Sequence, residues 1–246
     1  MTIIIPMAGL SSRFSKAGYV LPKYMLYVRN RSMFNLSVSS FEKYFVSCKF
    51  LFIARNIFDT STFIERECEL MGIKDYEIVI LDSPTRGQAE TVLKGIEKSS
   101  IDRKDSILIF NIDTIRPNFV FPENLSNSDG YLECFEGNGA NWSYAKTEDG
   151  LPMSKVVKTA EKEEISNYCS TGIYYFKTAQ TFINAYNENE KHPLSGEIKE
   201  LYVAPLYNYL INDKCDIRIN VIKKDEVIFS GVPEEYDTLL RNSLKV

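Results

Sequence analysis

A loop of small residues near the start of the chain has the features of a phosphate-binding site. The apolar run Ile3 to Ile5 predicts a buried strand, and the loop that follows it contains Ala, Gly and two Ser residues. Small residues let backbone N–H groups come close to an anion. Arg13 closes the loop and Lys23 follows about ten residues later, which supplies a planar guanidinium and a compact ammonium for phosphate oxygens. The stretch therefore predicts a phosphate cradle, in preference to an ordinary turn with two surface cations.

An acidic residue follows another expected buried strand. Residues 106–110 (SILIF) predict this strand, and Asn111-Ile112-Asp113 comes directly after it. Ligands of open α/β sheets bind at the carboxyl ends of the strands, where such a side chain would lie. Mg²⁺ prefers carboxylate, phosphate and water oxygens. Asp113 is therefore expected to bind a metal ion, and the alternative is a turn-capping Asp.

The remaining hydrophobic pattern predicts strands that alternate with helices. Strands are expected over 49–54 and 76–81, and helices over 33–44, 60–71 and 88–96. This alternation is typical of βαβ units with a largely parallel sheet. A second lobe is expected from about residue 129, with strands over 130–135 and 216–222 and helices over 178–187 and 197–212.

Composition narrows the class of protein. The 246 residues suffice for one α/β domain, and the net charge of −4 argues against nucleic acid or an anionic membrane as a partner. The five Cys residues are scattered and odd in number, which favours reduced thiols in the cytoplasm. No signal peptide or run of about 20 apolar residues is present, so a cytoplasmic enzyme without a membrane span is expected.

The first loop, together with Pro22-Lys23, resembles the AGxGxR…PK signature of the nucleotide-sugar pyrophosphorylases (sugar-phosphate nucleotidyltransferases). The resemblance implies catalytic roles for Arg13 and Lys23. It also implies that the triphosphate of a nucleotide is bound by Ala8, Gly9, Leu10, Ser11 and Ser12. Two residues depart from the signature: Ser11 stands at the second Gly, and Tyr24 at the Pro that usually follows the Lys.

Two further stretches extend the resemblance over nearly the whole chain. Gly87 and Gln88, which follow the third expected strand, match the segment that contacts the nucleobase. Glu161-Lys162, followed about ten residues on by Thr171-Gly172 and an aromatic strand, resembles the acceptor-binding segment of the family. Glu161 would then accept hydrogen bonds from acceptor hydroxyls, Lys162 would hold the acceptor phosphate, and Thr171 and Gly172 would line the acceptor site.

The same resemblance implies the fold and the cofactor. It implies an α/β, Rossmann-like nucleotide-diphospho-sugar transferase fold in one domain, with a nucleotide-binding part over about 1–128 and an acceptor-binding lobe over about 129–246. It implies Mg²⁺ on Asp113. Phe229 occupies the place of the second metal-binding Asp of the family, so Asp225 or Glu226 would have to substitute, unless one carboxylate suffices. Trp142 either packs the lobe or forms the floor of the acceptor pocket, and packing is favoured.

The expected reaction joins an NTP to a phosphorylated acceptor and releases pyrophosphate. CTP, dTTP or UTP would be the donor, and a sugar 1-phosphate or a non-sugar phosphate such as phosphoglutamine the acceptor. The opening residues 4–9 and residues 141–146 and 161–168 resemble a subgroup that serves capsule and surface-polysaccharide synthesis. A homodimer is also expected.

Two other functions remain open. A glycosyltransferase of the GT-A type is suggested by Asn111-Ile112-Asp113, which resembles a DxD metal motif, but that class does not require the first loop. A noncatalytic nucleotide-binding relative is suggested by the departures Ser11 and Phe229.

Overall fold

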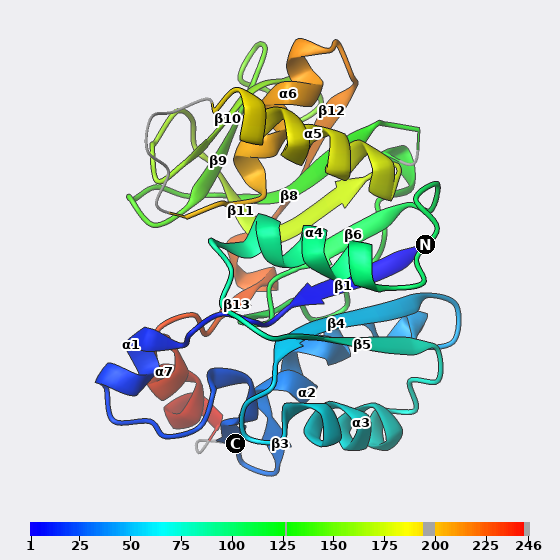
Figure 1. The fold of residues 1–246 in the computed structure, drawn as a ribbon. Helices are drawn as coiled ribbons and strands as arrows, with labels where there is room; N and C mark the ends of the chain where they lie inside the picture. Colours follow the sequence, from blue (N-terminus) through cyan, green and yellow to red (C-terminus); the bar gives the residue numbers. More distant parts are fainter. Residues whose placement is uncertain (126, 194–199, 244–246) are drawn as a thin grey trace.

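Four parallel strands form the centre of the main sheet, in the order β6, β1, β4, β5 (Figure 1). The computed structural model describes residues 1–125, 127–193 and 200–243. In it β6 is Ile107–Phe110, β1 is Thr2–Pro6, β4 is Lys49–Arg55 and β5 is Tyr76–Leu81. Nearly every residue of β6, β1 and β4 is buried, as is typical of strands covered on both faces. The parallel core predicted from the sequence is confirmed.

An antiparallel extension continues the sheet beyond β6. There β11 (Tyr168–Phe176) runs antiparallel to both β6 and β8 (Gly130–Glu136), and β12 (Ile217–Ile222) lies parallel to β8. The hairpin of β9 (Ser143–Thr147) and β10 (Val156–Glu161) adjoins β11. The result is the expected mixed sheet, whose second half belongs to the later part of the chain.

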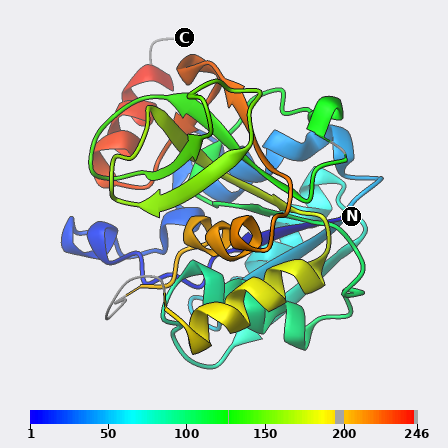
Figure 2. The same cartoon turned by 90° about the horizontal axis from the view of Figure 1, so that it is seen from above.

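Helices cover both faces of this sheet. Ile4 faces the layer that contains α4, α5 and α6, whereas Ile3 and Ile5 face the layer that contains α2 and α3, because successive side chains of a strand point to opposite faces. Figure 2 shows α4 and α5 on one side of β1 and α2 on the other. The helices are α2 (Met33–Val38), α3 (Thr60–Met71), α4 (Gln88–Lys98), α5 (Ala179–Lys191) and α6 (Tyr207–Asn212).

Short elements and a C-terminal helix complete the fold. Helix α7 (Pro233–Ser243) returns to the start of the chain and lies beside α1 (Ser12–Lys16), where Tyr236 packs against Phe14 at a ring-centroid distance of 6.1 Å (Figure 1). The short strands are β2 (Tyr27–Val28), β3 (Arg31–Ser32), β7 (Thr114–Ile115) and β13 (Ile228–Phe229). The 3₁₀ turns are η1 (Lys23–Met25), η2 (Ser39–Tyr44), η3 (Glu123–Leu125), η4 (Ala204–Leu206) and η5 (Lys224–Glu226).

The helix predicted over 197–212 is wrong for residues 200–203. Residues 197–199 lie outside the described part of the chain, and helical structure begins only at Ala204. Leu201 is extended because its backbone N–H donates to Arg86 O and its carbonyl accepts from Ala89 N, both at 2.9 Å. This pairing with another loop uses the backbone groups that a helix would need.

In the described residues no helix is long and apolar enough to cross a bilayer.

A buried ion pair ties the segment after β7 to the antiparallel part of the main sheet. Arg116 Nε donates to Glu133 Oε1 at 3.0 Å, and the side chains are 7% and 0% exposed. Thr171 Oγ1 and Asn220 Nδ2 also donate to the Glu133 carboxylate, at 3.2 and 3.3 Å. Arg116 Nη1 donates to the carbonyl of Glu226 at 3.2 Å. The pair therefore connects the segment after β7 with β8, β11, β12 and η5.

Removing one partner of this pair is expected to destabilise the protein strongly. Glu133→Ala removes the buried partner of Arg116 and leaves only the exposed Glu226 carboxylate, 3.6 Å from the guanidinium, to compensate its charge. We therefore expect the free energy of unfolding in urea to fall by about 3–5 kcal/mol. The double variant Arg116→Met with Glu133→Leu removes both charges and should lose less.

The exposed pair between Lys191 and Glu188, at 2.8 Å, provides the control. Glu188→Ala should lower the free energy of unfolding by no more than about 1 kcal/mol, because solvent screens this pair. Equal losses for Glu133→Ala and Glu188→Ala would show that the buried pair is not a structural tie.

Candidate active site

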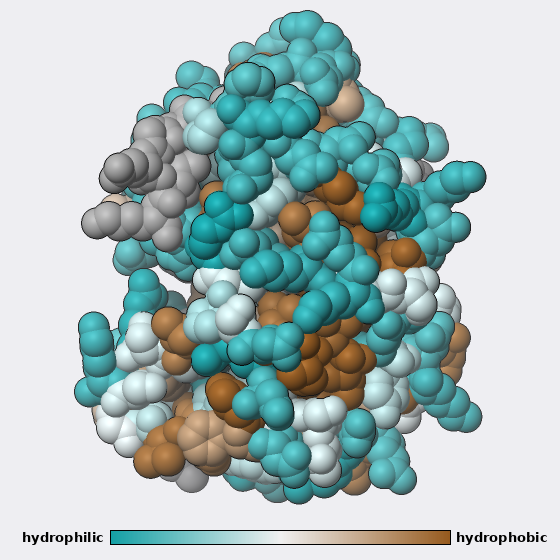
Figure 3. Space-filling view, in the orientation of Figure 1, coloured by the Kyte–Doolittle hydropathy of each residue, from teal (hydrophilic) through white to brown (hydrophobic). Residues whose placement is uncertain are grey.

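A cleft of about 800 Å³ lies where the carboxyl ends of the central strands face the β9–β10 hairpin. In Figure 3 the surface is hollowed at the left, between the part that carries α1 and the part that carries β9 and β10. Every site residue predicted from the sequence lines this cleft: Ala8, Gly9, Leu10, Ser11, Ser12, Arg13, Lys23, Gly87, Gln88, Asp113, Glu161, Lys162, Thr171 and Gly172. Residues up to 164 positions apart in the chain thus share one cavity, although their roles remain predictions.

The loop after β1 presents free backbone donors to the cleft. Among the described residues, no hydrogen bond uses the N–H groups of Gly9 to Ser12. A Cβ at Gly9 would have no neighbour within 4 Å, so the space over it is open. Ser11 has a left-handed backbone with φ of 50°, the conformation that a Gly would adopt without strain. The loop therefore forms the predicted turn in spite of the Ser.

Arg55 supports this loop and was not predicted from the sequence. Its Nε donates to Ala8 O at 2.9 Å, and its Nη2 donates to Gly9 O at 3.4 Å. These bonds hold the carbonyl oxygens of Ala8 and Gly9 near the end of β4. The available signal was a charged residue at the end of an otherwise apolar strand, at the edge of the sheet where ligands bind.

Two predicted catalytic cations come from this region. Arg13, on α1, is exposed, and its guanidinium forms no hydrogen bond or ion pair with the side chains or backbone that the structure describes. Lys23, at the start of η1, forms an ion pair with Asp113 at 2.5 Å, and both side chains are 24% exposed. The first cation is therefore available to a ligand, and the second is positioned by the candidate metal-binding carboxylate.

Asp113 is fixed by a segment from near the end of the described chain. The backbone N–H and the hydroxyl of Ser230 donate to Asp113 O at 2.9 and 3.0 Å. Phe229 pairs with Thr114 in the β13–β7 ladder. Gly231 lies against the carboxylate, since a Cβ there would be 3.0 Å from Asp113 Oδ2. Asp113 is thus held with its carboxylate toward the cleft.

The donor set at Asp113 fits Mg²⁺ with a limited protein contribution. Mg²⁺ in phosphate-processing sites is bound by one or two carboxylates together with substrate phosphates and water. Among the described residues no three His, Cys, Asp or Glu side chains cluster as a complete metal cage. The cleft has a hard oxygen donor in Asp113 and open space beside it, which suits an ion that arrives with a triphosphate.

The second carboxylate suggested at Asp225 or Glu226 is wrong, because neither residue lines the cleft. Glu226 lies 3.6 Å from Arg116 and accepts from Lys223 N instead. Glu235 on α7 does line the cleft and was missed; it accepts from Gly231 N at 2.8 Å. The sequence signal for Glu235 was an acidic residue in the first turn of a helix that follows the Phe229 segment.

Two glycines that line the cleft are required by close packing, Gly87 on the predicted nucleobase side and Gly172 on the predicted acceptor side. A Cβ at Gly87 would lie 2.4 Å from Leu201 O, and one at Gly172, where φ is 93°, would lie 2.5 Å from Asn111 Nδ2. Gln88 Nε2 donates to Asn111 Oδ1. Asn111 therefore bonds with Gln88 rather than joining Asp113 in a DxD motif. This removes the main support for the glycosyltransferase alternative.

Arg86, in the same loop, is engaged in ion pairs. Its guanidinium lies 3.1 Å from both Glu90 and Glu190, and its side chain is 53% exposed. The side chain is thus half exposed to solvent and is held by two acidic partners.

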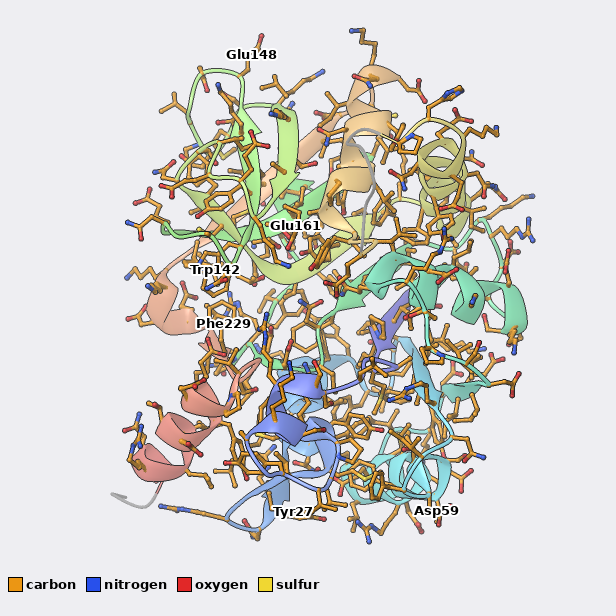
Figure 4. All side chains as sticks on the ribbon, turned by 60° about the vertical axis from the view of Figure 1, so that its left-hand side comes forward. Tyr27, Asp59, Trp142, Glu148, Glu161 and Phe229 are labelled. Atoms are coloured by element: carbon orange, nitrogen blue, oxygen red, sulfur yellow. The ribbon has the colours of Figure 1, made fainter. Side chains whose placement is uncertain are left out.

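The opposite wall carries the predicted acceptor-binding residues. Glu161 accepts a hydrogen bond from Ser143 Oγ, and burial raises the pKa of its carboxyl group. Lys162 has a left-handed backbone with φ of 58°, and its ammonium lies 4.7 Å from the ring centre of Tyr202. Tyr202 in turn donates to Glu200. Figure 4 shows Glu161 on this wall, with Trp142 and Phe229 below it.

Comparisons with known proteins agree with this geometry. No family model matches the chain, and a search of curated proteins finds no match. The crystal structure of the nucleoside-diphosphate-sugar pyrophosphorylase from Vibrio cholerae RC9 matches with a TM-score of 0.93 and 51% sequence identity, over 97% of this chain and 99% of that chain.

More distant structures share the fold alone. A UDP-glucose pyrophosphorylase complexed with UDP-glucose has a TM-score of 0.75 at 14% identity, over 99% of this chain and 98% of that chain. The inositol-1-phosphate CTP transferase from T. maritima has a TM-score of 0.73 at 12% identity, over 98% and 95%. Since 51% identity extends over almost all of both chains in the Vibrio cholerae match, this chain belongs to the nucleoside-diphosphate-sugar pyrophosphorylase family of nucleotidyltransferases.

Proposed function

We propose that the protein transfers the nucleoside monophosphate of an NTP to the phosphate group of a small acceptor, with release of pyrophosphate. The observation that supports this most directly is the shared cleft. Arg13, Lys23 and Asp113 come from the segments after β1 and β6, Glu161 and Lys162 come from the end of β10, and all five line this cleft. A triphosphate bound by the first group and a phosphorylated acceptor bound by the second would meet in the cleft.

The chemistry needs alignment and neutralisation of charge more than proton transfer. A phosphate monoester is largely dianionic near neutral pH, so the acceptor needs no general base. Its oxygen would attack the α-phosphorus in line with the departing pyrophosphate. Arg13 and the free N–H groups of the first loop would bind the β- and γ-phosphates, Lys23 would contact the reacting phosphates, and Lys162 would hold the acceptor phosphate.

Asp113 would hold Mg²⁺, which supplies positive charge to the phosphate oxygens when it is bound. Glu235 is close enough to the same region to orient water around the ion, since its carboxylate lies across Gly231 from Asp113. The donor in this proposal is CTP, dTTP or UTP. The acceptor is a sugar 1-phosphate or a non-sugar phosphate, and the product serves capsule or surface-polysaccharide synthesis in the cytoplasm.

A screen for pyrophosphate release tests the proposal. Each of four NTPs is mixed with MgCl₂ and a panel of sugar 1-phosphates and amino-acid phosphates, and pyrophosphate is measured with a coupled assay. We expect release with at least one pair and none when either substrate is omitted. Nucleotide binding without release across the panel would favour the noncatalytic alternative.

Loss of either member of the central ion pair should abolish most activity. We expect Lys23→Ala and Asp113→Asn each to lower kcat/KM by a factor of about 10² or more, because each removes a charge placed at the reacting phosphates. Circular dichroism and thermal unfolding would show that the variants remain folded. Lys16→Ala changes another lysine of the same region that does not line the cleft, and it should leave kcat/KM within about twofold of wild type. Near-normal turnover of Lys23→Ala and Asp113→Asn would refute the assignment.

The acceptor KM should depend on pH through Glu161. Burial raises the pKa of this carboxyl group, so it takes up a proton at a higher pH than an exposed Glu would. Protonation removes a hydrogen-bond acceptor, and the acceptor KM should therefore rise as the pH falls through the raised pKa. Glu161→Gln has nothing to titrate at this position and should lack that rise.

The measurement is the ratio of acceptor KM between Glu161→Gln and wild type as a function of pH. Titration of the acceptor phosphate affects both enzymes equally and cancels in this ratio. A ratio that stays constant with pH would contradict the role of Glu161.

A further inference from the structure

Two aromatic side chains form part of the cleft wall and have no role in the chemistry described above. Trp142 and Phe229 both line the cleft, with ring centroids 4.7 Å apart and planes tilted by 55°. Phe135 lies behind them, 5.2 Å from Trp142 and 5.5 Å from Phe229. Phe135 is fully buried, whereas the other two rings are only partly covered by protein. The pair is therefore supported from behind and open toward the cleft.

The pair extends from the candidate metal-binding carboxylate to the candidate acceptor residues. On one side, Phe229 is paired with Thr114, the neighbour of Asp113. On the other, Trp142 O accepts from Lys162 N at 2.8 Å. The next residue, Ser143, donates to Glu161. Figure 4 shows the two aromatic residues beside each other below Glu161.

The position of the two rings indicates which part of a substrate would lie against them. The faces of the rings carry no positive charge, so they attract a phosphate group poorly but give a carbon skeleton a surface to stack on. Glu161 beside them accepts hydrogen bonds, and the rings and this carboxylate together also favour an ammonium group. The nucleobase is the less suitable occupant, because the loop predicted to contact it, around Gly87, is joined by its backbone bonds to Leu201 and not to Trp142.

We propose that Trp142 and Phe229 determine acceptor specificity by stacking against the carbon skeleton of the phosphorylated acceptor, while Glu161 bonds to its hydroxyl or ammonium donors. The inference rests on the proposed function. Phe229 stands where the family places a second metal-binding carboxylate, so this position contributes to acceptor binding at the expense of a metal ligand. A sugar 1-phosphate and a phosphorylated amine or amino acid share this chemistry, and the experiment separates them.

Binding can be followed without turnover, because Trp142 is the single Trp of the chain. Its fluorescence, excited selectively at long wavelength, is titrated in the absence of NTP with glucose 1-phosphate, with O-phosphoserine and with methyl phosphate. We expect glucose 1-phosphate or O-phosphoserine to change the emission in a saturable way, and methyl phosphate, which lacks the carbon skeleton, to do so at least about tenfold more weakly. No saturable change with either of the first two compounds would overturn the inference.

Variants then assign the effect to the rings. Phe229→Leu should weaken binding of the responding compound about tenfold and raise its KM about tenfold, while the KM for NTP stays within about twofold. Phe121→Leu makes the same change at another half-buried ring, packed on Tyr44 and Phe119 outside the cleft, and should leave both KM values unchanged. Trp142→Phe keeps an aromatic ring in the wall. It is measured by KM, and it should raise the acceptor KM less than Trp142→Leu does.

The outcomes separate the two proposals. If the emission responds and Phe229→Leu weakens the response, but no NTP yields pyrophosphate, the proposed function is wrong, whereas the stacking role of Trp142 and Phe229 is supported. If wild type releases pyrophosphate, but the acceptor KM is within twofold of wild type in folded Phe229→Leu and Trp142→Leu, the stacking role of the two rings is wrong and the proposed function stands. Thermal unfolding establishes which variants are folded.

Discussion

The ion pair between Lys23 and Asp113 is the contact on which the geometry of the cleft depends. It joins the end of a long excursion after β1 to the carboxyl end of β6, and both side chains are only 24% exposed. Charges in such a place interact more strongly than at the surface. A triphosphate alone would engage Lys23 and leave Asp113 beside added negative charge. The pair therefore favours a triphosphate that arrives together with a cation.

The rest of the fold holds Asp113 in a fixed position beside Lys23. Ser230 bonds to the carbonyl of Asp113, and Ser37 Oγ donates to the carbonyl of Thr114 at 2.8 Å. The N–H of Arg116 donates to Ser40 Oγ at 2.8 Å, and its guanidinium is held by Glu133. Four partners from distant parts of the chain thus fix three of the four residues from Asp113 to Arg116. Such preorganisation lets fixed charges act on a transition state without the cost of reorganisation.

Local patterns predicted the elements and the members of the cleft well. The parallel strands were evident as apolar runs, and the loop, Asp113 and Glu161-Lys162 were recognised by residue type, order and resemblance. Contacts between segments far apart in sequence were not predictable. Leu201 is extended because it pairs with the Gly87 loop, and Glu235 reaches the cleft because α7 packs against the region of α1. Arg55 was hidden for the same reason, since its partners are backbone carbonyls 46 and 47 residues away.

Backbone strain marks both ends of the cleft. Ser11 and Lys162 are left-handed, a conformation that costs a residue with a Cβ on the order of 1–2 kcal/mol and that Gly adopts freely. At Ser11 the turn leaves the neighbouring N–H groups unbonded and facing open space, so the strain is linked to a set of free donors. At Lys162 it lets the backbone bond to Trp142 while the ammonium lies over Tyr202. A Gly at Lys162 would relieve the strain but would remove the cation that the proposed role in phosphate binding needs.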